Sequence, residues 1–136
     1  MLQKIDHVGI AVQSLEEVKT LFLKCFRMRP VFEETVPEQG VKVAGFKLGE
    51  SNLEFLEPTD AESPIARFLD KKGQGLHHIA VGVENIDTML NELKDKGVGL
   101  IDAKSRRGAE GKKIAFVHPK SVFGILLELS QDNSKP

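Results

Sequence analysis

The sequence predicts an α+β fold of two tandem βαβββ modules whose strands form one open curved sheet. Residues 5–12 and 76–83 are similar to each other at a spacing of 71 positions, which is the first of three supporting observations. Each copy runs into a helix-start signal, Ser14 in one and Asn85 in the other. Apolar stretches separated by turn residues then follow each helix. A repeat near 70 residues is too long for a solenoid and fits two fused halves.

A chain of 136 residues predicts a single domain, residues 1–136. Module one is expected at about 4–58, a linker at about 59–74 and module two at about 75–130. The linker contains a short helix with Pro64 in its first turn.

Composition indicates a soluble globular protein, with 40% hydrophobic and 29% charged residues. A net charge of -1 gives no argument for a nucleic-acid or membrane partner. No apolar run approaches the roughly 20 residues that cross a bilayer, and the N-terminus carries no signal-peptide core. The single cysteine, Cys25, cannot form an internal disulfide. We therefore predict a cytoplasmic protein in a reducing compartment.

Alternation in the first strand separates two faces. Val8 and Ile10 share one face, whereas His7 shares the other with Gly9 and Ala11. The small neighbours leave space beside the imidazole, so this face is the candidate for a polar site.

The helix that follows is predicted to begin at Ser14, which forms a capping box with Glu17. Pro30 prevents its continuation. Cys25 falls on its apolar face and is predicted to be a small core residue. Turn residues then separate three expected strands, at 31–36, 41–48 and 53–57.

The second module repeats this plan. His78 shares a strand face with Ala80 and Gly82, and the helix runs from Asn85 towards Gly97. A glycine- and lysine-rich hairpin region is expected at 103–113, and a polar, frayed tail from residue 130. The expected strands are 98–101, 114–117 and 124–129.

The final strands of the two modules also correspond and pair Glu54 with Glu128, each of which interrupts an apolar strand. With His7 and His78, the duplication supplies one histidine and one glutamate twice. Such nitrogen and oxygen donors suit a divalent cobalt, manganese, nickel or zinc ion. A lone strand histidine or glutamate is usually only a satisfied polar residue, but the coincidence in both halves favours a metal cleft.

The duplicated unit resembles the vicinal oxygen chelate superfamily, which includes glyoxalase I, extradiol dioxygenases and antibiotic-binding proteins. Within that superfamily, the chain is similar to the methylmalonyl-CoA epimerase family along nearly its whole length. The stretches that carry this similarity are 6–12, 37–41, 60–69, 77–81 and 116–129.

This resemblance implies metal ligands at His7, Glu54, His78 and Glu128, with Co²⁺ first and Mn²⁺, Ni²⁺ or Zn²⁺ as alternatives. It also implies a homodimeric isomerase acting on methylmalonyl-CoA, in which Glu38 and Glu128 are the acid/base pair. Two groups on opposite sides of a planar enolate would epimerise the alpha carbon directly, while the metal stabilises its charge. Without the resemblance, Glu38 is interpreted as an exposed turn carboxylate.

A basic stretch within residues 104–113 would suit the phosphates of coenzyme A, although a solvated loop explains it equally well. His77 faces away from His78 and is interpreted as structural or exposed. His118, in a turn before Pro119, is either a turn residue or one that faces the substrate.

Two other functions fit the same scaffold. A glyoxalase I-type lyase would use similar enediolate chemistry, and a metal-free antibiotic-binding protein would need no such His and Glu set. An extradiol dioxygenase fits less well, because its iron site needs one carboxylate fewer and its chains are usually longer.

Overall fold

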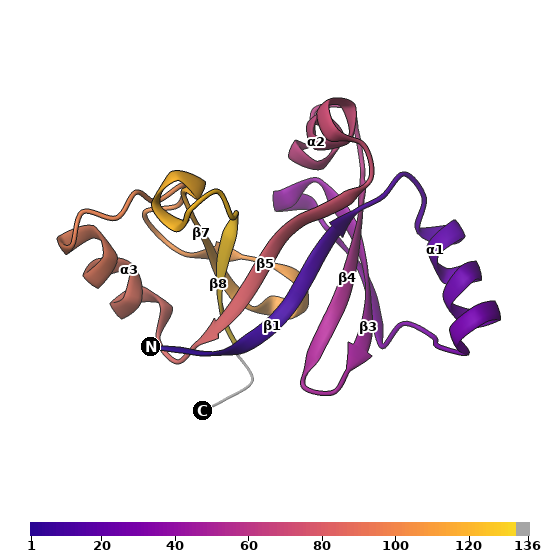
Figure 1. The fold of residues 1–136 in the computed structure, drawn as a ribbon, viewed down its shortest axis with the longest axis horizontal. Helices are drawn as coiled ribbons and strands as arrows, with labels where there is room; N and C mark the ends of the chain where they lie inside the picture. The colour runs from indigo at the N-terminus through magenta and orange to yellow at the C-terminus, as the bar shows by residue number, and fades with distance from the viewer. Residues whose placement is uncertain (133–136) are drawn as a thin grey trace. The chain divides into compact units, whose positions relative to one another are not determined.

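The computed structural model describes residues 1–132, in two compact units. Unit 1 consists of Met1–His7 together with the chain from His78 onward, and unit 2 is Val8–His77. Strands β1 (Leu2–Ala11) and β5 (Gly75–Val83) therefore each contribute to both units. Figure 1 shows the elements along the chain.

The strands of unit 2 are hydrogen-bonded in the order β2-β3-β4-β1. Its meander consists of β2 (Phe32–Val36), β3 (Val41–Leu48) and β4 (Ser51–Pro58), paired antiparallel. The amide of Val12, directly after β1, donates to the carbonyl of Leu56 at 2.9 Å. The buried core of the unit is Val12, Leu15, Ala44, Phe46 and Phe55.

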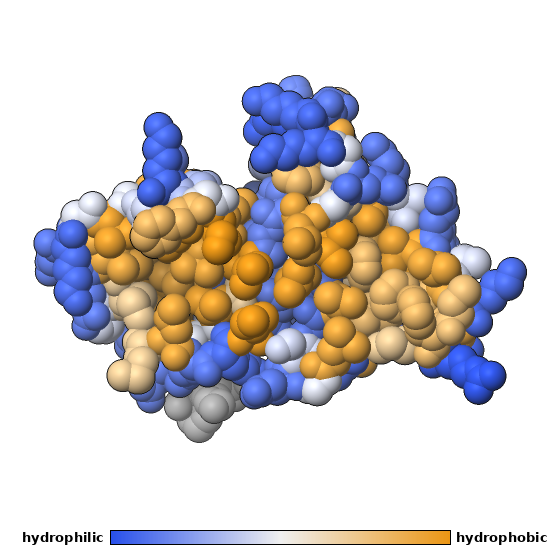
Figure 2. Space-filling model, in the orientation of Figure 1, coloured by the Kyte–Doolittle hydropathy of each residue, from blue (hydrophilic) through white to orange (hydrophobic). Residues whose placement is uncertain are grey.

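Helix α1 (Leu15–Leu21) begins as predicted, with the Ser14 hydroxyl accepting from the Glu17 amide at 3.2 Å. The expectation for Cys25 is wrong, because this side chain is exposed. The chain widens into a π-helical turn, η1 (Phe22–Phe26), and a wider turn rotates later residues off the face that a 3.6-residue period gives them. Figure 2 shows apolar surface in the region of α1.

The linker forms α2 (Pro64–Lys72), with Pro64 in the first turn as predicted. Ser63 is the N-cap, and its hydroxyl accepts from the Ile65 amide at 3.1 Å. Gly73 ends the helix at a φ of 76°, a value that glycine adopts without strain.

The strands of unit 1 follow the order β1-β5-β8-β7-β6. β8 (Leu127–Gln131) pairs parallel with β5 and antiparallel with β7 (Lys113–Val117). Helix α3 (Ile86–Asp95) is capped by Asn85 and contacts β7 and β8. The buried core of unit 1 is Val83, Ile86, Leu90, Ala115, Val117 and Leu129.

Two details of unit 1 differ from expectation. Residues 98–101 form only a single bridge, Leu100 to Val117, because the backbone of Gly99 bonds instead to Ser121 and His118 in a following turn. The short strand is β6 (Arg106–Arg107), inside the predicted hairpin region.

Strand β8 continues through Ser130 and Gln131, where a frayed tail was expected to begin. The remainder of that expected tail, residues 133–136, lies outside the described residues. Within residues 1–132, no helix is long and apolar enough to cross a membrane.

Candidate metal centre

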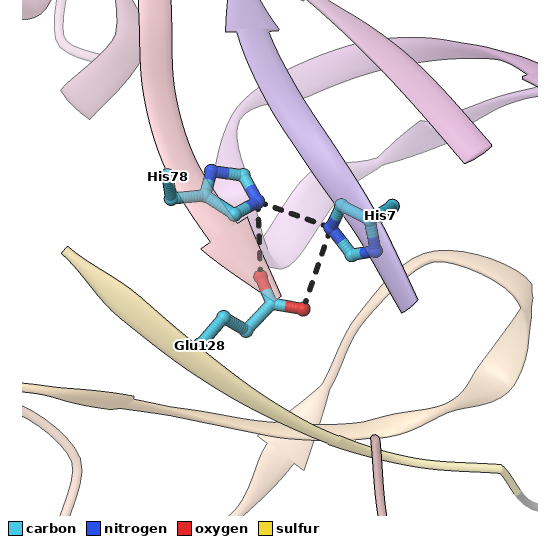
Figure 3. A group of neighbouring side chains, drawn as sticks. All are labelled: His7, His78 and Glu128. Atoms are coloured by element: carbon cyan, nitrogen blue, oxygen red, sulfur yellow. Dashed lines mark hydrogen bonds and ion pairs between the residues drawn. The ribbon is translucent and has the colours of Figure 1, made fainter. Parts of the chain in front are cut away.

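Three predicted ligands converge in unit 1: His7 from β1, His78 from β5 and Glu128 from β8. Figure 3 shows their side chains pointing toward one another. They are only 6%, 7% and 4% exposed, respectively. Strand alternation explains the two histidines, because each shares its buried face with the small residues predicted to leave space beside it.

The donor atoms of this group lie within 4.8 Å of one another. The Nε2 atoms of His7 and His78 are 3.1 Å apart. The carboxylate of Glu128 lies 3.6 Å from the His7 nitrogen and 3.3 Å from the His78 nitrogen.

These residues fit a divalent ion. Two nitrogens each about 2.1 Å from one ion, at a right angle, lie about 3.0 Å apart, close to the separation seen. Imidazole nitrogens and a carboxylate oxygen are donor types that such an ion takes, and a buried charge in a protein is paired or coordinates a metal.

A small residue and an aromatic residue lie opposite Glu128 in the sheet. Ala80, fully buried, lies opposite Glu128 in the pairing of β5 with β8. Phe116 lies opposite Glu128 in the pairing of β7 with β8. Its ring meets the His78 ring edge-on, with centroids 5.5 Å apart, and packs as an apolar wall.

Asp6 and Lys112 form a polar connection behind His7. The His7 Nδ1 atom lies 2.8 Å from a carboxylate oxygen of Asp6, and the Lys112 ammonium donates to the same carboxylate at 3.1 and 3.2 Å. Burial on its own raises the pKa of Asp6. The hydrogen bonds and charges of His7 and Lys112 outweigh burial and lower that pKa to about 2, so Asp6 is a carboxylate.

The other two predicted site residues belong to unit 2. Glu54 lies on β4 opposite Gly45 of β3 and is only 4% exposed. Glu38 is exposed on the short turn η2 (Pro37–Gln39), which Gly40 closes at a φ of 66°. The ligand role of Glu54 and the acid/base role of Glu38 stay predictions.

The predicted basic stretch forms the β6–β7 hairpin and lines an open cavity of about 480 Å³. Its charged lining is entirely cationic. The lining residues are Ser105, Arg106, Arg107, Gly111, Lys112 and Lys113.

The remaining histidines have structural contacts. The ring of His77 meets the ring of Phe68 edge-on at 4.9 Å between centroids. Burial, followed by the charge of Lys72, lowers the pKa of His77 to about 4, so the ring is neutral at pH 7. The Nδ1 atom of exposed His118 accepts from the Lys120 amide at 3.1 Å and caps a turn.

Sequence reasoning missed Asp6, Lys112 and Phe116. Asp6 precedes His7 directly, but strand alternation assigns adjacent residues to opposite faces, so the pair was not recognised. Lys112 lies 106 residues away from Asp6, and nothing in its local sequence singles it out from its basic neighbours.

Comparison with known proteins defines the class. Residues 6–116 match the family model of the Glyoxalase/Bleomycin resistance protein/Dioxygenase superfamily. The chain belongs to this superfamily, which confirms the predicted α+β fold class together with the structural match described next.

Individual relatives narrow the class. The chain is 44% identical to the uncharacterized protein YqjC of Bacillus subtilis, over 96% of this chain and 93% of that protein. It is 37% identical to human mitochondrial methylmalonyl-CoA epimerase, over 96% and 74% of the two chains. A solved variant of Streptomyces coelicolor methylmalonyl-CoA epimerase, in complex with 2-nitronate-propionyl-CoA, superposes with a TM-score of 0.94 over the full length of both chains at 35% identity.

Within the superfamily, the chain belongs with the methylmalonyl-CoA epimerases. The predicted resemblance and the predicted isomerase class are thereby confirmed.

Proposed function

We propose that this protein is a metal-dependent methylmalonyl-CoA epimerase that interconverts the 2R and 2S forms of its substrate. The observation that carries the proposal is the buried convergence of His7, His78 and Glu128 in a chain whose relatives are epimerases. We further propose a cytoplasmic homodimer with no nucleic-acid or membrane partner.

Four side chains would hold the ion: His7, Glu54, His78 and Glu128. Co²⁺ is our first choice, with Mn²⁺, Ni²⁺ or Zn²⁺ as alternatives, because imidazole and carboxylate together suit these borderline ions. The burial of Glu54 supports its inclusion, since buried carboxylates in proteins are either paired or coordinate a metal. When bound, such an ion supplies a Lewis acid for the negative charge that develops on the substrate oxygen.

Glu38 and Glu128 would move the proton. Epimerisation requires that the alpha proton leave one face of the carbon and return to the other, and two carboxyl groups do this when one takes a proton as the other gives one. Glu38 is exposed and outside the ligand set, so its carboxylate is available as a base. Glu128 would also hold the ion, which makes it the weaker base of the two.

The cavity of the β6–β7 hairpin supports a coenzyme A substrate. Arg106, Arg107 and Lys113 face it without an acidic residue among the lining side chains. Arginine and lysine are the side chains that bind phosphate groups with charge-assisted hydrogen bonds. We propose that the phosphates of coenzyme A are bound here.

The direct test is isotope exchange at the alpha carbon. One-handed methylmalonyl-CoA is incubated in heavy water with Co²⁺-loaded protein, and deuterium entry is followed by mass spectrometry against a protein-free control. We expect deuterium to enter and the opposite epimer to form. No exchange above the control with any of the four ions would overturn the proposal.

A second substrate separates the closest alternative function. The glutathione hemithioacetal of methylglyoxal, offered to the same metal-loaded protein, should remain unchanged. Its conversion, without exchange in methylmalonyl-CoA, would assign glyoxalase I-type chemistry in place of epimerisation.

A further inference from the structure

We infer that Asp6 and Lys112 are positioning residues for the metal centre: Asp6 fixes the tautomer and direction of His7, and Lys112 holds Asp6 in place. This inference rests on the metal site of the proposed function. It concerns two residues that lie outside the proposed ligand set and outside the proposed acid/base pair.

The contact with Asp6 determines which ring nitrogen of His7 carries the proton. A carboxylate only accepts hydrogen bonds, so the 2.8 Å contact between His7 Nδ1 and Asp6 assigns the imidazole proton to Nδ1. In the neutral ring, Nε2 then carries a lone pair. That atom faces the Nε2 of His78 at 3.1 Å and Glu128 at 3.6 Å, which is where a ligand lone pair is needed.

The same contact fixes the orientation of the His7 ring. An imidazole bonded at Nδ1 to a fixed acceptor cannot rotate about its bond to the chain without breaking that bond. Metal-bound histidines in proteins usually donate their second ring N–H to a carboxylate or carbonyl in this way, which fixes the ring and makes it a better ligand.

Lys112 holds the side chain of Asp6 in place. Its side chain is only 11% exposed and that of Lys112 only 17%. Removing one partner of an ion pair this far from water is destabilising, because the remaining charge loses its closest opposite charge. Lys112 contacts both carboxylate oxygens, at 3.1 and 3.2 Å, and so limits rotation of the carboxylate.

The hairpin fixes Lys112 in turn. The Gly108 amide donates to the Lys112 carbonyl at 2.9 Å, and the Lys112 amide donates to the carbonyl of Ala109 at 3.3 Å. Arg107 pairs with Lys113 across the strands on either side. The β6–β7 hairpin therefore contacts Asp6 through the Lys112 side chain, whereas the neighbouring Lys113 ammonium lies 3.7 Å from Asp87.

The experiment measures Co²⁺ affinity by competition with a chelator, together with the visible spectrum of the bound ion. Asp6→Asn should weaken binding by about 10- to 100-fold, the usual effect of removing such a partner. Lys112→Met should weaken it in the same direction but less, and Lys112→Arg should restore it because the positive charge is kept. The matched control, Lys113→Met, should bind Co²⁺ with the affinity of the wild type.

A double variant tests whether Lys112 acts through Asp6. Adding Lys112→Met to Asp6→Asn should cause no further loss of Co²⁺ affinity, because the lysine then has no carboxylate at position 6 to hold. Additive losses would mean that Lys112 acts independently and would overturn that part of the inference.

A metal-free readout is the ¹⁵N spectrum of the imidazoles. Wild-type His7 should show its proton on Nδ1, and Asp6→Asn should lose this preference. If Asp6→Asn does not fold, as judged by circular dichroism, the pair Lys112→Met and Lys112→Arg carries the test.

Two results would contradict the inference, and they are distinguishable. Wild-type Co²⁺ affinity and an unchanged His7 tautomer in folded Asp6→Asn would overturn the positioning role alone. A wild-type chain that binds no divalent ion would overturn the metal site of the proposed function, and the positioning role with it.

Discussion

Two buried imidazoles whose Nε2 atoms are 3.1 Å apart constrain each other's protonation. Both nitrogens cannot carry a proton at that distance without repulsion, so the His7–His78 pair shares at most one between them. The proton that Asp6 assigns to His7 Nδ1 leaves His7 Nε2 as the acceptor. His7 is thus already in the tautomer that a metal ligand requires.

The two proposed bases should respond differently to neutralisation. Glu38→Gln should reduce kcat by about 10²- to 10⁴-fold, as loss of a general base does, and leave Co²⁺ affinity unchanged. Glu128→Gln should reduce both. The measurements are steady-state kinetics and chelator competition, with exposed Glu92→Gln of α3 as the control. Weakened metal binding in Glu38→Gln would contradict the division of roles.

His77 should make stability depend on pH. Its pKa is about 4 in the folded chain, below its ordinary 6.5, so the unfolded chain binds more protons between these values. The free energy of unfolding therefore falls as the pH drops from 6.5 to 4. We expect urea unfolding of the metal-free wild type to lose more stability over this window than His77→Gln does. Equal losses would mean that His77 is not the cause, and exposed His118→Gln serves as the control.

At the scale of elements, the β2–β3 hairpin shows how one small residue places a strand. Gly45 lies opposite Phe32, and the Phe32 ring lies where a side chain at position 45 would be. Gly45 also pairs with Glu54 on its other side. The glycine therefore allows an aromatic ring to cover the strand next to the buried Glu54.

Gly45→Ala should destabilise unit 2. The added methyl overlaps the Phe32 ring, and overpacking of this kind costs about 1–3 kcal/mol. Chemical denaturation measures the loss. Gly82→Ala is the matched control, since its Cβ would make only ordinary contacts, 3.5 Å or more, with Lys4. A stable Gly45→Ala would show that Phe32 leaves its place freely.

Elements were predictable where local signals were strong. Ser14, Asn85 and Pro64 mark helix starts in the sequence, and each lies at one in the structure. The outward turn of Cys25 was not predictable, because no residue in the helix signals the change from a 3.6-residue turn to a π turn. The missing strand at 98–101 depends on backbone bonds from Gly99 to a distant turn, which local pattern does not contain.

At the scale of the whole molecule, the duplication and the two units divide the chain differently. The sequence repeat separates module one from module two in the linker, whereas the compact units separate between His7 and Val8 and between His77 and His78. Each repeated strand thus changes unit at its histidine. As a result, His7 and His78 belong to the same compact unit although they come from different repeats.

The duplication made His7, His78 and Glu128 predictable, because it marks corresponding positions without knowledge of contacts. It did not mark Asp6 and Lys112. The repeat has a histidine, His77, at the position that corresponds to Asp6, and Lys112 lies in a hairpin of the second half. Contacts that do not follow the repeat, such as the one between Asp6 and Lys112, could be recognised only from the fold.

Metal removal should lower the stability of the whole chain. An ion that binds only the folded state adds about 1.4 kcal/mol for each tenfold rise in its concentration above the Kd. We expect the Tm of the wild type to rise with Co²⁺ and to fall with a chelator, and that of His78→Ala to shift less with each. Equal Co²⁺ responses in the two proteins would place the bound ion elsewhere.

The central claim is that each repeat supplies one histidine to a single ion. X-ray absorption at the cobalt edge, on protein carrying one equivalent of Co²⁺, tests it most directly. We predict the scattering of two imidazoles with oxygen donors in the wild type, and of one imidazole in His78→Ala. A first shell of oxygen alone, or one imidazole in the wild type, would contradict the account.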